Sequence, residues 1–179
     1  MSIGGPVTVL LRNVLIEGNA ARSFVAQGGG IWIGSGSLRL VDSTIRDNVA
    51  QGQTAMPATP DGGTALGGGI NSNSAASVLI RGSTISGNVT SGTNAGGSNG
   101  NGGSSLGGGI WAGGPLHIES STVSGNAALD PGAPTGGGAF GIARGGGIAP
   151  GRTTAASGSR GTGGAASAKP ALPSSPMRT

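Results

Sequence analysis

The chain of 179 residues lacks cysteine altogether and has a single histidine. The absence of cysteine excludes a disulfide framework and a thiolate metal site. Aromatic residues make up only 2% and charged residues 9% of the chain, whereas charged residues are about 25% of an average globular domain. Apolar stretches stay well short of the roughly 18 residues that a membrane-spanning helix needs. The sequence therefore predicts neither a disulfide-stapled fold nor a membrane span.

Charge is distributed unevenly, so the formal net charge of +4 does not describe the whole chain. All six acidic residues lie at or before Asp130, together with five arginines, and the other five cations lie between Arg144 and Arg178. The first 130 residues are thus close to neutral, which predicts no nucleic-acid partner. Residues 1–11 show no charged start and no full apolar centre of an export signal, so the chain alone assigns no compartment.

Glycine is abundant, with 41 residues, and 12 of them belong to one recurring motif, which we call the glycine phrase. Gly-Gly-Gly-Ile occurs four times, at 28–31, 67–70, 107–110 and 145–148. Collagen is excluded, because its triple helix requires glycine at every third position. The regular spacing indicates a repeat architecture in which each copy is one structural unit.

Alignment of the copies places like residues in columns. Each copy contains the isoleucine of the glycine phrase, then two apolar residues spaced i, i+2, and then a single β-branched residue. These three apolar positions predict three short strands per copy. Isolated short strands are marginal in water, so we expect the copies to stack with like residues over like. The columns are Val9/Leu11, Leu38/Leu40, Val78/Ile80 and Leu116/Ile118; Ile16, Ile45, Ile85 and Val123; and Ile31, Ile70, Ile110 and Ile148.

Two polar columns and the glycine phrase have predicted structural roles. Asparagine tolerates the left-handed conformation and can hydrogen-bond along a stack, so we expect an asparagine ladder at a turn. We expect a similar serine ladder, and we expect the glycines to supply positive φ and a close approach of backbones. The asparagine ladder consists of Asn19, Asn48, Asn88 and Asn126, and the serine ladder of Ser43, Ser83 and Ser121.

These phrases resemble the right-handed parallel β-helix repeat proteins of bacteria, the pectate-lyase-like superfold. The likeness is to the group with Gly-Gly-Gly-Ile and a turn asparagine, as in polymorphic outer-membrane and autotransporter-like surface proteins. The resemblance implies an all-β solenoid with about three full rungs plus partial rungs. It also implies an extracellular or cell-surface location.

The predicted organisation is a β-helix region at 1–148 followed by a low-complexity, disordered tail at 149–179. The tail contains one leucine and no isoleucine, valine or aromatic residue. We expect the glycine-rich connectors between the rungs to be flexible surface loops; the alternative is that they form a ligand-binding edge. The rungs lie near 7–21, 28–50, 67–90 and 107–128 with a stub at 145–148, and the glycine-rich connectors are 51–66, 91–106 and 129–144.

The ionisable residues predict no catalytic centre, metal site or cofactor. No aligned column holds two carboxylates, unlike the clustered acids of carbohydrate lyases that share this superfold. Glu119 aligns with Arg81, which we interpret as a surface ion pair. His117, the only histidine, is expected to point into solvent because its neighbours Leu116 and Ile118 point inward.

Two tryptophans are the candidate binding residues. Trp32 and Trp111 follow Gly-Gly-Gly-Ile at the same position, with Asn71 between them in the alignment. Their rings could stack on sugars, or they could pack beneath a connector. Outward Thr44, Thr84 and Thr122 form a short hydroxyl column, and ice binding is a further alternative.

Taken together, the sequence predicts a non-enzymatic, structural or adhesin-like segment of a secreted or cell-surface protein. A carbohydrate or a host-surface ligand is the expected partner. The first rung is incomplete and neither end of the repeat region shows a cap, which leads us to expect a piece of a longer protein. The alternative is the remnant of a carbohydrate-active β-helix enzyme, a polysaccharide lyase or hydrolase, that lacks its catalytic rungs.

Overall fold

The computed structural model describes residues 1–54, 61–95, 100–132 and 139–150. All regular structure in these ranges is β-strand, and every strand pairing is parallel. The strands form four sheets, named A to D here in the order in which the chain visits them. None of the described residues belongs to a helix that is long and apolar enough to cross a lipid bilayer.

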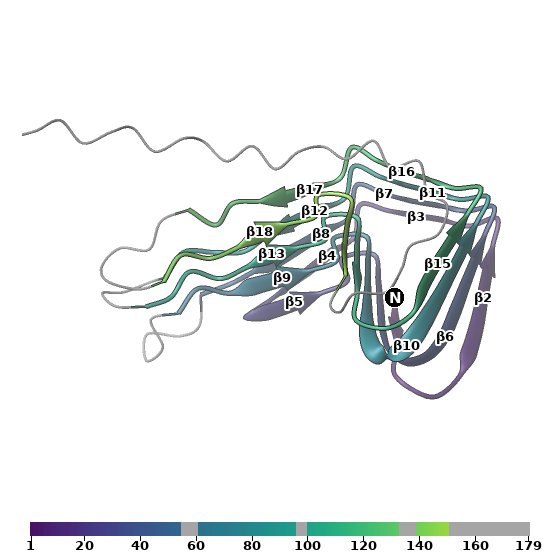
Figure 1. Cartoon of the computed structure of the whole chain (residues 1–179), viewed down its shortest axis with the longest axis horizontal. Coiled ribbons are helices and arrows are strands. Elements are labelled where there is room, and N and C mark those ends of the chain that lie inside the picture. The colour runs from purple at the N-terminus through teal and green to yellow at the C-terminus, as the bar shows by residue number, and fades with distance from the viewer. Residues whose placement is uncertain (55–60, 96–99, 133–138, 151–179) are drawn as a thin grey trace, which may run out of the picture.

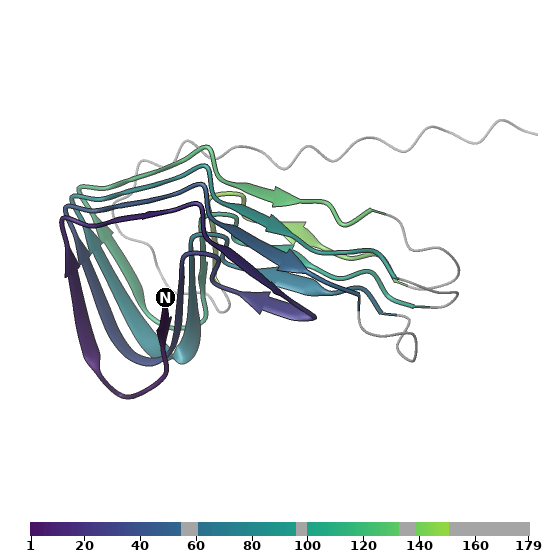
Figure 2. The ribbon, with the colours of Figure 1, turned by 180° about the vertical axis from the view of Figure 1, so that it is seen from behind.

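Each repeat contributes to all four sheets in turn, so the chain passes from A through B, C and D and returns to A (Figures 1 and 2). Sheet A contains β1 (Ser2–Ile3), β2 (Thr8–Arg12), β6 (Ile31–Val41), β10 (Ile70–Arg81), β14 (Ile110–Ala112), β15 (Leu116–Glu119) and β19 (Ile148–Pro150). Sheet B contains β3 (Leu15–Glu17), β7 (Thr44–Arg46), β11 (Thr84–Ser86) and β16 (Thr122–Ser124).

Sheets C and D project together to one side of sheets A and B, and we call this projection the arm (Figure 1). Sheet C contains β4 (Ala20–Ser23), β8 (Val49–Gly52), β12 (Val89–Ser91) and β17 (Ala127–Leu129). Sheet D contains β5 (Val25–Gln27), β9 (Thr64–Leu66), β13 (Ser105–Leu106) and β18 (Ala143–Arg144).

The register puts like residues over like, as the alignment of the copies predicted. Ile70 pairs with Ile31 on one side and with Ile110 on the other, and Ile85 pairs with Ile45 and Val123. The buried side chains of sheets A and B therefore form one continuous core. Its fully buried members include Ile31, Ile33, Leu38, Leu40, Ile45, Ile70, Ile80, Ile85 and Ile110.

The arm corrects the prediction of three strands per copy and of connectors made only of loop. Each of the three glycine-rich connectors ends in a strand of sheet D: β9, β13 and β18. A second buried cluster of Ala26, Ala50 and Ala65 joins sheets C and D. Small side chains allow two sheets to pack closely but give no hydrophobic alternation, so the prediction lacked the strands of both sheet C and sheet D. The two strands predicted near Ile31 and at Leu38–Leu40 are instead one continuous strand, β6.

The fourth glycine phrase also extends further than the predicted stub. Strand β19 runs to Pro150 and pairs with β14, so that Ala149 lies beside Trp111 and is buried. The boundary of the predicted tail at 149 therefore falls inside a strand. The rest of that tail, 151–179, lies outside the described residues.

Candidate functional site

The four predicted asparagines form one hydrogen-bonded ladder at the junction between sheets B and C. Asn48 donates from its main-chain nitrogen and from Nδ2 to Oδ1 of Asn88, at 3.0 and 2.9 Å. Asn88 makes the same two bonds to Oδ1 of Asn126, and Asn19 makes them to Oδ1 of Asn48. Asn48 and Asn88 are completely buried. The ladder thus fixes the turn of each repeat to the turn of the next.

Each asparagine after the first also holds the main chain of the preceding repeat, and Nδ2 of Asn48 donates to the Ile16 carbonyl oxygen at 3.0 Å. Nδ2 of Asn88 donates to the Ile45 carbonyl oxygen at 3.0 Å, and Nδ2 of Asn126 donates to that of Ile85 at 2.9 Å. A buried main-chain carbonyl without a partner costs about 1–3 kcal/mol. The asparagine column therefore satisfies main-chain groups as well as its own amides.

The serine column forms a shorter ladder before sheet B. The main-chain nitrogen of Ser43 donates to Oγ of Ser83 at 3.1 Å, and that of Ser83 donates to Oγ of Ser121 at 3.0 Å. Ser43 and Ser83 are buried. Two polar columns therefore bracket the three-residue strands of sheet B.

The asparagines of the ladder do not adopt the left-handed conformation that the sequence predicted for them. Positive φ falls on the residue just before each: Gly18, Asp47, Gly87 and Gly125, with φ of 67°, 56°, 64° and 62°. Glycine has no Cβ penalty in this conformation, and aspartate tolerates it. This arrangement leaves the asparagine free to turn its side chain into the stack.

The glycine phrase behaves as predicted. The first glycine of each phrase has φ between 60° and 64°, at Gly28, Gly67, Gly107 and Gly145. A Cβ on the second, Gly68, would come within 2.3 Å of the Gly108 carbonyl oxygen. The backbones of successive repeats therefore approach so closely at this turn that no side chain fits.

Trp32 and Trp111 occupy one outward position of sheet A, on alternate strands. Both pair with Asn71, which lies between them on β10. The two tryptophans are half-buried, and Asn71 is completely buried. Among the described residues, Nδ2 of Asn71 has one hydrogen bond, a long one of 3.4 Å to the Leu66 carbonyl oxygen. The structure thus brings together the two candidate binding residues that the sequence singled out.

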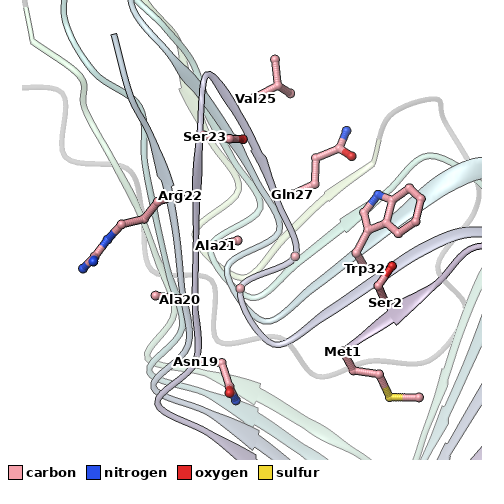
Figure 3. A pocket seen from close by; sticks show the side chains of 12 residues that line it. Met1, Ser2, Asn19, Ala20, Ala21, Arg22, Ser23, Val25, Gln27 and Trp32 are labelled. Atoms are coloured by element: carbon pink, nitrogen blue, oxygen red, sulfur yellow. The ribbon is translucent and has the colours of Figure 1, made fainter. Parts of the chain in front are cut away.

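Each tryptophan borders a hollow. Trp32 lines one of about 610 Å³ at the first-repeat end of the stack, which is bounded mainly by β4, β5 and the N-terminus (Figure 3). Trp111 lines another of about 370 Å³, together with Leu106 and Arg144. Within the described residues, neither of these two hollows includes an acidic side chain in its lining.

Other candidate residues are dispersed over the surface. Glu119 pairs with Arg81 in register, but among the described residues no ion pair joins them, which corrects the predicted interaction. The described ion pairs are those of Arg46 with Glu17 at 2.8 Å and with Asp47 at 3.9 Å, and that of Arg12 with Asp42 at 3.7 Å. His117 is exposed, as expected. No group of three or more metal-ligating side chains occurs in the part of the chain that the structure describes.

Comparisons with protein-family models, with curated proteins and with solved structures found no match to this chain.

Sequence reasoning missed the surroundings of the tryptophans. Gly34 and Gly113 lie two residues after Trp32 and Trp111, and a Cβ on either would come within 2.7 and 3.0 Å of the ring atom Cη2. The Trp-x-Gly spacing occurs at both tryptophans and could have predicted that a glycine lies beneath each ring. Leu66 and Leu106, each directly before a glycine phrase, form the adjacent column of sheet D, and that recurrence was also visible.

Proposed function

We propose that this chain is a right-handed parallel β-helix, or solenoid, that serves as a non-enzymatic structural segment of a secreted or cell-surface protein of the adhesin type. The observation that carries the proposal is the passage of every repeat through the same four parallel sheets in register. A repeat protein of this kind is stabilised mainly by contacts between neighbouring repeats. Its length therefore grows with the number of repeats, which suits a stalk or a passenger domain.

The distribution of polar groups supports a scaffold over a catalyst. The deeply buried polar side chains include Asn48, Asn88, Ser43 and Ser83, and their hydrogen bonds run from repeat to repeat. Asp42 and Asp47 lie at turns with positive φ, next to arginines. These groups satisfy and shape the backbone of the stack.

Removal of one complete repeat tests this proposal. Asn48 and Asn88 are 40 residues apart at equivalent positions, so deletion of residues 49–88 joins Asn48 to Val89, which pairs with Val49 in the full chain. We expect the shortened protein to keep the same β-type circular dichroism per residue and to unfold cooperatively at a lower denaturant concentration, because one inter-repeat interface is lost.

Deletion of residues 49–68 is the matched control, because it removes half a repeat and joins sheet B to sheet A without an arm. We expect this variant to lose the β-type spectrum. If the two deletions are equally tolerated, or if both abolish folding, the solenoid proposal fails.

A further inference from the structure

We propose that the two ends of the stack bind each other, so that a second copy of this chain adds head to tail. The inference rests on the proposed solenoid, because only in-register repeats give the two ends matching patterns. The head is the outer edge of β2, β3, β4 and β5, and the tail is the outer edge of β15, β16, β17 and β18. Among the described residues, each of these strands pairs with a neighbouring strand on one side only. Unpaired edges of this kind accept strands of another chain.

The asparagine ladder ends in donors at the tail and in an acceptor at the head. Each asparagine donates from its main-chain nitrogen and from Nδ2 to Oδ1 of the asparagine in the following repeat. Asn126 is the last of the ladder, and no described residue accepts a hydrogen bond from its main-chain nitrogen. Asn19 is the first, and no described residue donates to its Oδ1. A second copy placed with Asn19 over Asn126 therefore continues the ladder with the same two bonds.

The same placement satisfies a main-chain group at the tail. Within the stack, Nδ2 of Asn126 donates to the Ile85 carbonyl oxygen at 2.9 Å. Val123 is the partner of Ile85 in the last layer of sheet B, so its carbonyl oxygen lies at the equivalent position for Nδ2 of the second copy's Asn19. The donors and acceptors of the two ends thus match in kind and in position.

Exposed apolar side chains also gather at the two ends. Of the described residues, the large apolar side chains that are exposed all lie in the first or the last repeat. One column of sheet D shows the change: Val25 and Ile142 stand at its ends, and Thr64 and Ser104 stand between them. In a head-to-tail pair, Val25 of one copy lies against Ile142 of the other, and both leave water. The exposed apolar residues are Met1, Val7, Leu10, Leu15, Phe24 and Val25 near the head and Leu129, Phe140 and Ile142 near the tail.

The charges at the two ends are complementary. Arg12, Val41, Arg81 and Glu119 form one column of sheet A, in that order. Head-to-tail stacking therefore brings Arg12 of the second copy beside Glu119, which has no ion-pair partner among the described residues. An exposed ion pair adds little affinity, but opposite charges favour this orientation over one in which two heads meet.

Strand β1 opposes the joining of the ends. Continuation of the stack puts β19 against β6 of the second copy, on the edge where β1 of that copy pairs. β1 contains only Ser2 and Ile3, and Gly4 and Gly5 follow it, so it can leave sheet A without moving β2. Its displacement exposes the buried Ile3. Removal of β1 should therefore strengthen association.

Disulfide trapping between copies of the full chain tests the inference, because the wild-type chain has no cysteine. Leu15, Thr44, Thr84 and Thr122 form one column of sheet B. Leu15 and Thr122 are three strand spacings apart within one copy, about 14 Å, but one spacing of about 4.8 Å apart in a head-to-tail pair. Only the second distance lies within the disulfide range of about 4.4–6.8 Å.

We expect Leu15→Cys mixed with Thr122→Cys to give a covalent heterodimer on mild oxidation, seen by mass spectrometry. The variant Leu15→Cys/Thr122→Cys should give covalent dimers, trimers and longer series, because a heterologous contact does not close. Thr44→Cys, one repeat inward in the same column, is the matched control and should give little heterodimer with Thr122→Cys. Cross-linking of Leu15→Cys to itself as readily as to Thr122→Cys would contradict the head-to-tail orientation.

Analytical ultracentrifugation over a concentration series measures the association without cysteines. Ile142→Lys should weaken it at least about tenfold, because it places an unpaired charge against Val25 of the second copy. Ser104→Lys makes the same change in an inner repeat of the same column and should leave association unchanged. Deletion of residues 2–5, which removes β1, should strengthen it.

Circular dichroism and denaturant unfolding of each variant separate an association defect from a folding defect. If the wild-type chain and the variant without residues 2–5 are both folded and both remain monomeric, the head-to-tail contact is overturned and the solenoid proposal stays intact. Equal effects of Ile142→Lys and Ser104→Lys would likewise overturn it.

Discussion

Replacing Asn88 with alanine is expected to lower the free energy of unfolding by about 3–5 kcal/mol. The substitution leaves the main-chain nitrogen of Asn48 without its Oδ1 acceptor and the Ile45 carbonyl without its side-chain donor. It also removes one of the three acceptors of Asn48 Nδ2, which keeps the Ile16 and Arg46 carbonyl oxygens. Each orphaned buried group costs about 1–3 kcal/mol, and domains are typically stable by only about 5–15 kcal/mol. Denaturant unfolding monitored by circular dichroism measures the change.

Asn19→Ala is the matched control, because Asn19 stands in the same ladder but is exposed. Water can replace its partners, so we expect a cost of only about 1 kcal/mol. Equal costs for the two substitutions would show that the ladder does not stabilise the stack in the way described here.

Replacing Gly68 with alanine is expected to prevent folding or to cost at least about 3 kcal/mol, at the upper end of overpacking effects. The added Cβ would lie 2.3 Å from the Gly108 carbonyl oxygen and 2.5 Å from that of Val89. Both atoms belong to backbone, which cannot rotate away as a side chain can. Soluble yield, circular dichroism and the unfolding midpoint report the outcome.

Gly147→Ala serves as the comparison, since Gly147 stands in the same phrase of the fourth repeat. The nearest atom to a Cβ there is Cγ1 of Val123 at 3.6 Å, an ordinary contact. We expect this variant to be as stable as the wild-type chain or slightly more stable, because alanine restricts the unfolded state. A Gly68 variant as stable as the Gly147 variant would contradict the close packing of the turns.

The sequence predicted the parts of the fold that repeat in chemical kind. Isoleucine, leucine and valine recur in columns, and the structure places Ile31, Ile70 and Ile110 side by side. The sequence did not predict the arm. Its buried apolar cluster is Ala26, Ala50 and Ala65, whose small side chains allow close packing but produce no alternation of apolar and polar residues. The prediction also placed the left-handed conformation on the wrong residue, since the aspartate and glycines before the asparagines tolerate it too.

The candidate site was predicted in part. The positions of Trp32 and Trp111 followed from the alignment, because each comes directly after a glycine phrase. Their environment did not follow, since the seating of a ring over Gly34 and the burial of Asn71 depend on the angle between sheets D and A. That angle is set by the turns between the sheets. The glycines predict where the chain turns, but they do not predict the direction that it takes after the turn.

Disulfide cross-linking tests most directly the central claim that the repeats stack in register. The wild-type chain has no cysteine, so every thiol would be an introduced one. Thr84 and Thr122 are Cα partners on the outward face of sheet B, and partners on adjacent parallel strands lie about 4.8 Å apart, within the disulfide range of about 4.4–6.8 Å. Mild oxidation of Thr84→Cys/Thr122→Cys should therefore yield a monomer without free thiols, detected by mass spectrometry after alkylation.

Thr84→Cys/Ser124→Cys is the control, because its two positions are two residues out of register and roughly 8 Å apart. This variant should keep its free thiols. Equal cross-linking of the two pairs would contradict the in-register stack.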